Sequence, residues 1–175
     1  MPENKRTRDD LYQEAAASCG AALGRLARAY EADPDKRRDL LQEIHVALWR
    51  SFEYFEGRCS LRTWVYRIAH NTATSVAIRP KLKAPAFVGL DEVEASVQED
   101  GEASLDQQQA LERLWALIQK LKPSDKQVML LYLEGMDAAA IGDITGFSSS
   151  NIATKVHRIK KVLSRKFRKG DRRAE

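Results

Sequence analysis

The feature that most constrains the fold is a pair of helical patterns joined by a tight turn in the C-terminal third of the chain. Asp137 is placed to cap a short helix that ends at Thr145, and Ser148 is placed to cap a longer one. Gly142 supplies a small residue where two helix backbones approach, and Gly146 tolerates positive φ at the turn. This spacing predicts a helix-turn-helix.

Apolar residues at three- and four-residue steps support this arrangement. The wedge expected to fix the crossing angle consists of Ile141, Phe147, Ile152 and Val156. Further inward-facing positions on the long helix are Ile159, Leu163 and Phe167. An earlier helix, Ala110 to Leu121, is expected to carry a stripe of Leu111, Leu114, Leu117, Ile118 and Leu121. Between the two, Ser124 and Gln127 are predicted to form a capping box for a helix that Gly135 ends.

The N-terminal half also has helical periodicity. Two helices are expected first, from Leu11 to Cys19 and from Ala21 to Ala32, with Asp33-Pro34 closing the second. A long helix from Lys36 to about Phe55 follows. The sequence Glu56-Gly57-Arg58 breaks it, and Ser60 can cap a further helix.

No stretch alternates apolar and polar residues for long, so the predicted fold class is all-α. Residues 79–109 contain Pro80, Pro85 and Gly89, and between Leu90 and Gln109 they carry seven acids and no bases. This composition predicts a flexible acidic linker. The expected organisation is therefore two small helical domains, residues 1–78 and 110–175, joined by that linker.

Several classes of protein are disfavoured by what the 175 residues contain. No apolar run approaches the roughly 18–20 residues of a membrane span, and the N-terminus lacks the apolar core of a signal peptide, so a cytoplasmic location is expected. Cys19 and Cys59 have no ligand spacing for a metal, and we expect buried thiols. The histidines His45, His70 and His157 fall on separate helices without a carboxylate cluster. We expect no enzyme, metal or cofactor.

A second motif is a segment rich in aromatic residues and arginines, residues 49–71. Five aromatic residues crowd into fifteen positions: Phe52, Tyr54, Phe55, Trp64 and Tyr66. Aromatic faces accept unstacked bases of any identity, and the interspersed arginines can follow a phosphate backbone. The loop 56–59 could form a pocket for an extruded base. The alternative is an ordinary aromatic core with a basic rim: Trp49 and Phe52 are predicted to be core, and Trp64 is evenly balanced between the two.

The long C-terminal helix carries polar residues suited to the major groove near its start. The residues predicted to contact duplex DNA are Ser149, Ser150, Asn151, Thr154, Lys155, Arg158 and Lys161. From Lys155 to Arg173 there are ten basic residues against the single acid Asp171, which suits an anionic polymer. Lys160, Lys161 and Arg165 are placed for phosphate. A plain helical hairpin with a polar face is the alternative.

These two motifs resemble a known family. Residues 39–71 (DLLQEIHVALWRSFEYFEGRCSLRTWVYRIAHN) look like conserved region two of bacterial sigma factors, in the compact extracytoplasmic-function (ECF) branch. Residues 121–163 look like their region four. The resemblance implies a dissociable RNA polymerase subunit whose first domain recognises and melts the −10 promoter element and whose second reads the −35 element.

The resemblance also implies roles for particular residues. Docking onto the clamp coiled coil of the largest core subunit falls to Asp39, Gln42 and Glu43. The −10 non-template strand would contact Phe55, Arg58, Ser60, Arg62, Thr63, Trp64, Arg67 and Asn71. The face around Val128 to Tyr132 would approach the β-subunit flap, and the linker would thread through the polymerase. An anti-sigma factor or other regulator and a role in stress response are expected, with no membrane insertion.

The chain departs from the family pattern at two places. Lys36, Arg37 and Arg38 stand where acids are common, so docking is expected to be weaker, or to need a partner or modification. Ala139-Ala140 replaces common glutamates. Three rival functions stay open: a stand-alone helix-turn-helix regulator, a nucleic-acid enzyme, and a protein that binds anionic lipid through its basic helix.

Overall fold

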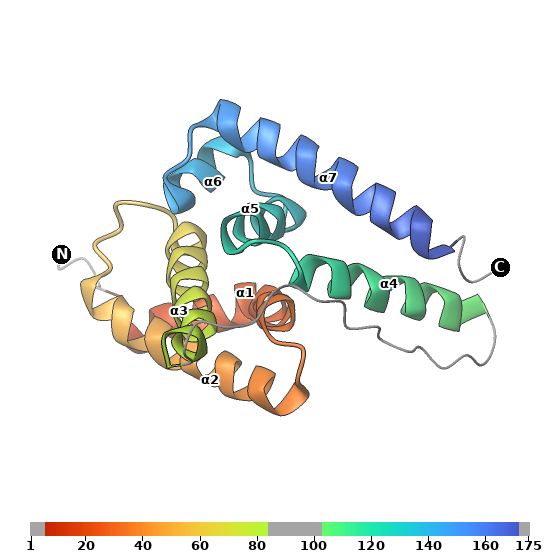
Figure 1. The fold of residues 1–175 in the computed structure, drawn as a ribbon. Coiled ribbons are helices and arrows are strands. Elements are labelled where there is room, and N and C mark those ends of the chain that lie inside the picture. Colours follow the sequence, from red (N-terminus) through yellow and green to blue (C-terminus); the bar gives the residue numbers. More distant parts are fainter. Residues whose placement is uncertain (1–5, 84–102, 172–175) are drawn as a thin grey trace.

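The computed structural model describes residues 6–83 and 103–171, and within them it contains helices and no strand, which confirms the all-α prediction (Figure 1). The elements are α1 (Arg8–Tyr30), α2 (Pro34–Ser51), η1 (Phe52–Tyr54), α3 (Leu61–Lys83), α4 (Ala103–Gln119), α5 (Pro123–Leu133), α6 (Ala138–Thr145) and α7 (Ser149–Asp171). Both α3 and α4 extend into the range expected as linker, and the centre of that range lies outside the described residues.

The first helix is longer than its sequence pattern indicated. Thr7 and Asp10 form a capping box at its start, and it runs unbroken through Gly20. The prediction of two separate helices is therefore wrong. A glycine inside a helix costs about 1 kcal/mol, and the buried stripe on both sides of Gly20, including Cys19 and Leu23, outweighs that cost.

Helix α2 begins where its cap directs and ends earlier than expected. The Asp33 carboxylate accepts from the backbone N–H groups of Asp35 and Lys36, and Pro34 occupies the first helical position. The α-helix stops at Ser51, and one 3-10 turn follows. Phe52 is buried as predicted, but Trp49 is not core.

Trp49 remains 37% exposed because it lies at the edge of the α2 stripe. The Arg8 guanidinium stacks on its ring at 3.4 Å, and its indole N–H donates to Asp9. The N-terminal turn of α1 therefore covers a side chain that periodicity alone assigned to the interior.

Two further expectations for the C-terminal half are wrong. Pro123 starts α5 one residue before Ser124, so the helix lacks a side-chain cap and the Ser124–Gln127 box does not form. On α4, Leu111 is 48% exposed, whereas Trp115 and Ile118 are buried. The rest of the predicted stripe faces the core, because Leu114, Leu117 and Leu121 are partly buried and pack against the same cluster as Ile118.

The helix-turn-helix forms as predicted. Asp137 caps α6 through the Ala140 N–H, and Gly146 after it has φ 78°. A Cβ on Gly142 would lie 2.9 Å from the Phe147 carbonyl oxygen, which explains the need for glycine there. The predicted wedge packs in one apolar cluster between α5, α6 and α7.

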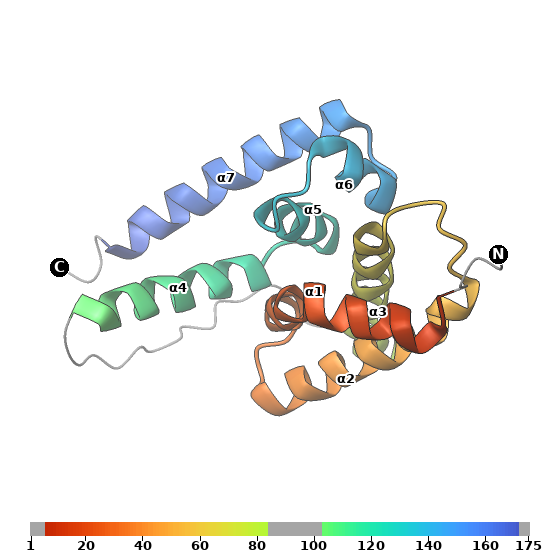
Figure 2. The same cartoon turned by 180° about the vertical axis from the view of Figure 1, so that it is seen from behind.

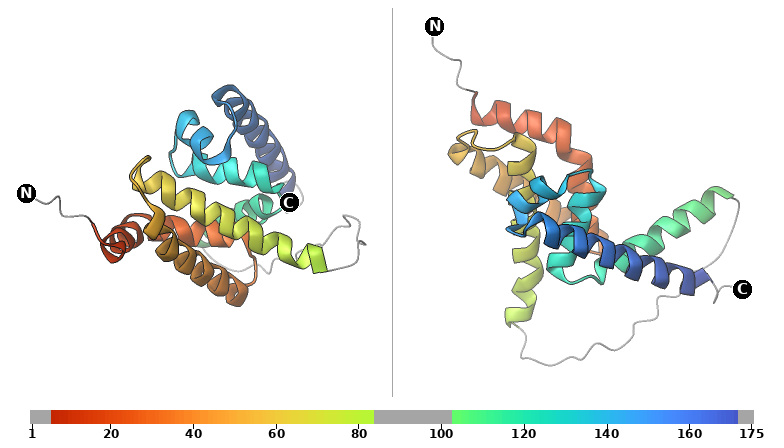
Figure 3. Two further views of the ribbon diagram at one scale, coloured as in Figure 1. Left: turned by 90° about the vertical axis from the view of Figure 1, so that its left-hand side faces the viewer. Right: turned by 90° about the horizontal axis from the view of Figure 1, so that it is seen from above.

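The two halves of the chain pack against each other. Helix α3 lies between a layer formed by α1 and α2 and a layer formed by α5, α6 and α7 (Figure 2, Figure 3). Trp115 and Ile118 of α4 join the core of the N-terminal helices, and Ala22 and Tyr66 join the apolar cluster of the helix-turn-helix. The hydrophobic interior therefore crosses from one half to the other.

Candidate nucleic-acid interface

The aromatic and arginine-rich segment forms a pocket of about 480 Å³ beside the start of α3. Its lining consists of Tyr54, Phe55, Glu56, Arg58, Cys59, Trp64 and Arg67, with Asp143 contributed by α6. Gly57 has φ 73°, a backbone conformation that lets the loop turn sharply between η1 and α3. We call this cavity the aromatic pocket.

The aromatic walls of this pocket are held in place. Trp64 donates its indole N–H to Ser51 Oγ at 2.9 Å, and its ring centre lies 5.4 Å from that of Phe55. Phe55 in turn meets buried Phe52 edge-on. Tyr54 stands at the mouth, 72% exposed. A flat, partly apolar partner such as a base can stack here without much rearrangement of the walls.

The predicted −10 residues divide into several groups. Phe55, Arg58, Trp64 and Arg67 line the aromatic pocket. The Ser60 and Thr63 hydroxyls lie 2.9 Å apart, and the Thr63 N–H donates to Ser60 Oγ, which caps α3. Thr63 is buried. Arg62 stacks over the Tyr66 ring and donates to the Glu134 carbonyl oxygen. Asn71 lies apart from them, in a different pocket.

Sequence reasoning named Tyr54 among the aromatic residues and the loop 56–59 as a possible pocket, but it missed Asp143, which α6 contributes to the lining. Tyr54 and Glu56 flank Phe55 in the turn, and Cys59 follows Arg58. Their position in the loop was the available signal, because residues of a tight loop share one small space. Cys59 is half-buried rather than core, unlike the buried Cys19.

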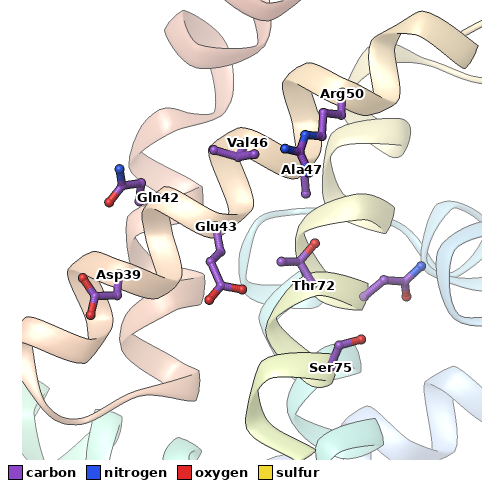
Figure 4. A pocket seen from close by; sticks show the side chains of 9 residues that line it. Asp39, Gln42, Glu43, Val46, Ala47, Arg50, Thr72 and Ser75 are labelled. Carbon is purple, nitrogen blue, oxygen red and sulfur yellow. The ribbon is translucent and has the colours of Figure 1, made fainter. Parts of the chain in front are cut away.

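The second pocket, of about 760 Å³, separates α2 from α3 (Figure 4). Its lining consists of Asp39, Gln42, Glu43, Val46, Ala47, Arg50, Asn71, Thr72 and Ser75. Asp39, Gln42 and Glu43 are all exposed, and Val46 is 43% exposed beside them. An acidic rim next to apolar surface fits a basic helix with an apolar stripe. We call this cavity the α2–α3 groove.

The three basic residues before Asp39 have different surroundings. Arg37 donates to the carbonyl oxygens of Glu31 and Ala32, at 3.1 and 2.7 Å, and so satisfies acceptors just beyond the C-terminus of α1. Arg38 lies 3.4 Å from Asp35 in a highly exposed pair. Lys36 is exposed and lines a smaller pocket that shares Asp39 with the α2–α3 groove. Arg37 is therefore structural, whereas the other two are at the surface.

The start of α7 presents polar side chains to solvent. Ser149, Ser150, Asn151, Thr154 and Lys161 are exposed. Ser148 caps the helix through the Asn151 N–H, at 3.3 Å. The helix therefore offers its first two turns as a polar ridge, as predicted.

Lys155 and Arg158 differ from these neighbours because both bind Asp125 on α5. Lys155 Nζ lies 2.9 Å from one carboxylate oxygen, and an Arg158 nitrogen lies 2.8 Å from the other. The Lys155 side chain is 18% exposed and lies against the Phe147 ring. The Arg158 side chain is 60% exposed, so it has surface left for another anion.

Two of the three histidines lie next to tyrosine hydroxyls. Burial lowers the pKa of His70 to about 3, so its ring is neutral near pH 7, next to the Tyr30 hydroxyl. Burial also lowers the pKa of His45, whose Nδ1 lies 3.0 Å from the Tyr12 hydroxyl. Over residues 6–83 and 103–171, no group of three or more His, Cys, Asp or Glu could hold a metal ion. In the same ranges no helix is long and apolar enough to cross a membrane.

Family models match both halves of the chain. The model described as Sigma-70 region 2 matches residues 16–79, and the model described as Sigma-70, region 4 matches residues 111–163. The chain belongs to the sigma-70 family. The first match contains the aromatic pocket and the α2–α3 groove, and the second contains the helix-turn-helix. This family is one of transcription initiation factors that bind core RNA polymerase and promoter DNA.

Relatives assign this sigma factor to the ECF branch. It is 25% identical over 136 residues to the ECF RNA polymerase sigma factor SigX of Bacillus subtilis (strain 168), covering 75% of this chain and 70% of SigX. It is 26% identical over 173 residues to the ECF RNA polymerase sigma factor SigW of the same strain, covering 92% and 84%. It is an alternative sigma factor that directs RNA polymerase to promoters.

A solved structure shares the fold. CnrH in complex with the cytosolic domain of CnrY matches with a TM-score of 0.62 and 19% identity, covering 87% of this chain and 84% of CnrH. The RNA polymerase sigma factor CnrH comes from Cupriavidus metallidurans. The likeness supports the helical architecture of this sigma factor.

Proposed function

We propose that the aromatic pocket takes one unstacked base of the −10 non-template strand, and that promoter opening depends on it. The observation that carries this proposal is the indole of Trp64, fixed by Ser51 and facing the loop that contains Arg58. Unstacking a base costs a few kcal/mol, and stacking on an aromatic side chain returns about 1–3 kcal/mol per base. Contacts to the duplex and to the polymerase supply the remainder.

The start of α7 reads the −35 duplex in this proposal. Ser149, Ser150, Asn151 and Thr154 are exposed at the helix end that enters a major groove. Arg158 and Lys161, further along, meet phosphate. The face of α5 around Tyr132, which is 39% exposed, approaches the β-subunit flap.

Core polymerase docks on the α2–α3 groove through Asp39, Gln42 and Glu43. Charge and shape support this assignment, since the rim is acidic and Val46 offers an exposed apolar contact. Lys36 and Arg38 are exposed at the adjoining end of α2 and weaken docking onto a basic clamp surface. A regulator that covers them, or a modification that neutralises them, would strengthen docking.

The remaining assignments follow from the same function. The chain acts in the cytoplasm, makes and breaks no bond, and needs no cofactor. A regulator of the anti-sigma class restrains it and links it to a stress signal, and CnrH bound to the cytosolic domain of CnrY is the supporting parallel. The acidic residues between the two halves run through the polymerase as a linker between domains 1–78 and 110–175.

The test is run-off transcription from fragmented host DNA with bacterial core polymerase, with and without the chain. New discrete start sites that appear only with the chain, and that disappear with Trp64→Ala, support the proposed pocket. Start sites that persist unchanged with Trp64→Ala contradict it. Tight DNA binding without polymerase-dependent starts would favour a stand-alone regulator.

A further inference from the structure

An acidic residue of α5 lies against the helix that we propose to read the −35 duplex. Asp125 stands in the first turn of α5, and each of its carboxylate oxygens binds one basic side chain of α7. Lys155 Nζ lies 2.9 Å from Oδ1, and an Arg158 nitrogen lies 2.8 Å from Oδ2. The Asp125 side chain is 13% exposed, so solvent screens these pairs less than ordinary surface pairs. One carboxylate therefore joins the start of α5 to α7.

The two cations differ in how much of each side chain stays accessible. The Lys155 side chain is 18% exposed, and its ammonium lies 4.9 Å from the centre of the Phe147 ring in the turn before α7. The Arg158 side chain is 60% exposed although it binds the same carboxylate. A guanidinium carries five N–H donors in a planar fork, and the bond to Asp125 is made by one terminal nitrogen. Arg158 can therefore bind a second anion while Asp125 holds it.

We propose that Asp125 is a positioning residue for DNA binding, which holds Arg158 so that the outer side of its guanidinium meets a phosphate beside the −35 element. Asp125 itself stays bound to the protein and touches no DNA. The inference rests on the proposed function of α7, in which Arg158 meets phosphate, and it adds the residue that aims this arginine.

The held arginine lies on the face of α7 that is open to a duplex. Thr154, four residues before Arg158, and Lys161, three residues after it, are both exposed, and such spacings place side chains on one helix face. Helix α7 itself carries no acid before its last residue, Asp171. The carboxylate of Asp125 is thus brought to this basic helix from a different element by folding.

A carboxylate in this place has two opposite effects on DNA binding. Its negative charge repels phosphates, so by itself it weakens binding. On the other side, an arginine loses rotamer freedom when it binds a phosphate. Asp125 restricts Arg158 already in the folded chain, so less freedom is lost when DNA arrives. Because the two effects have opposite signs, removing the carboxylate shows which one is larger.

The experiment measures binding of the full chain to two fluorescent duplexes of equal length over a range of salt concentrations. One duplex carries the −35 region of a promoter found by run-off transcription, and the other has a random sequence. Asp125→Asn removes the carboxylate charge and Arg158→Gln removes the proposed phosphate contact, each alone and both together. As a control, Asp35→Asn makes the same charge change at an exposed pair with Arg38 on α2, on the opposite side of the molecule from α7 (Figure 1, Figure 2).

Two further variants separate positioning from folding stability, and melting temperatures check that each variant folds. Asp125→Glu keeps the carboxylate and should bind DNA nearly as the wild type does. Asp125→Asn combined with Lys155→Met removes the less exposed cation together with its partner, so no ammonium is left uncompensated inside the protein. This combined variant keeps the net charge of the wild type and still lacks the group that holds Arg158.

Asp125→Asn should weaken duplex binding about five- to tenfold at about 0.1 M salt, and should lower the slope of log affinity against log salt by about 0.9, the loss of one phosphate contact. Arg158→Gln should show the same loss, and Asp125→Asn should add nothing to it. The combined variant with Lys155→Met should lose the same slope. Asp35→Asn should leave the slope unchanged.

Tighter binding or an unchanged slope in a folded Asp125→Asn variant overturns the proposal, because Asp125 would then only compete with DNA for Arg158. A loss that persists in the Arg158→Gln background also overturns it, since Asp125 would then act through helix packing. If Asp125→Asn does not fold, the combined variant with Lys155→Met decides by the same criteria.

Failure of the proposed function has a different signature. Absence of start sites in the run-off assay, or equal affinity of the wild type for the two duplexes, would reject the reading of a −35 element by α7. The slopes measured on the random-sequence duplex would still decide whether Asp125 positions Arg158 on phosphate.

Discussion

The indole N–H of Trp64 on α3 donates to Ser51 Oγ at the end of α2, with 2.9 Å between Nε1 and Oγ. This bond joins the end of α2 to α3 and fixes the ring that we propose to stack against a base. Ser51 in turn donates to the Leu48 carbonyl oxygen, so the bond is part of a short chain of hydrogen bonds.

Substituting each partner in turn should distinguish the effect of losing the Trp64 ring from the effect of losing the hydrogen bond that holds it. Trp64→Ala should weaken binding of the −10 single strand by about 1–3 kcal/mol, because the stacking face is lost. Ser51→Ala keeps the ring but frees it, and should cost about 0.5–1.5 kcal/mol of folding stability. Permanganate footprinting of the open promoter and chemical denaturation measure the two effects. If the Trp64→Ala variant still opens the promoter fully, the assignment of Trp64 as the stacking surface is contradicted.

Arg37 and Arg38 are neighbours with opposite expected behaviour. Arg37→Gln removes the donors to Glu31 and Ala32, and should lower the free energy of unfolding by about 1 kcal/mol. Arg38→Glu should leave stability unchanged and tighten core polymerase binding, because it replaces an exposed positive charge near Asp39. Denaturation and fluorescence-based polymerase titration distinguish them. Unchanged polymerase affinity in Arg38→Glu would reject the docking argument.

Glycines in the chain can be divided by the space around them. Gly20 lies within α1 and has no atom near a Cβ position, so Gly20→Ala should stabilise the protein by about 0.5–1 kcal/mol. A Cβ on Gly142 would lie 2.9 Å from the Phe147 carbonyl oxygen. Gly142→Ala should therefore destabilise the helix-turn-helix and weaken −35 duplex binding. Melting temperatures and duplex binding check both, and a tolerated Gly142→Ala would contradict the close approach.

Buried His70 should make stability depend on pH. Its pKa is about 3 in the folded chain because burial disfavours the charged ring, whereas an unfolded histidine titrates near 6.5. Above about pH 6.5 neither state gains a proton there, so stability is fully present. As pH falls below that value only the unfolded state is protonated, and stability drops by at most about 1.4 kcal/mol per pH unit, down to the folded pKa. The slope should flatten in His70→Gln; equal slopes would show that other groups dominate.

Local chemistry allowed much of the fold to be predicted. The cap at Asp137 and the positive φ at Gly146 depend on residues within a few positions of each other. The helix break predicted around Gly20 was wrong because burial of the residues on both sides offsets the cost of a glycine in a helix. Periodicity does not take that burial into account. Trp49 was misjudged because it stays 37% exposed and contacts Arg8 and Asp9 of another helix instead of the core.

The candidate site was predictable in part for the same reason. Phe55, Trp64 and Arg67 lie close together in sequence and share one pocket. The contact between Arg25 and Glu134 joins positions 109 residues apart, and no local pattern announces such a pair. The occupation of the pocket wall by α6 is likewise a property of how the halves pack.

Lys155 and Lys161 share one helix but differ in what they bind, and this difference can be measured in the salt dependence of DNA binding. Lys155 is held by Asp125, whereas Lys161 is exposed. A lysine that neutralises a phosphate contributes about 0.9 to the slope of log affinity against log salt. Lys161→Gln should reduce the slope for a −35 duplex by about that amount. Lys155→Gln should leave the slope unchanged and instead lower folding stability, because Asp125 then has Arg158 as its one remaining ion-pair partner. A reduced slope in Lys155→Gln would show that this lysine leaves Asp125 for DNA, as the sequence pattern alone predicted.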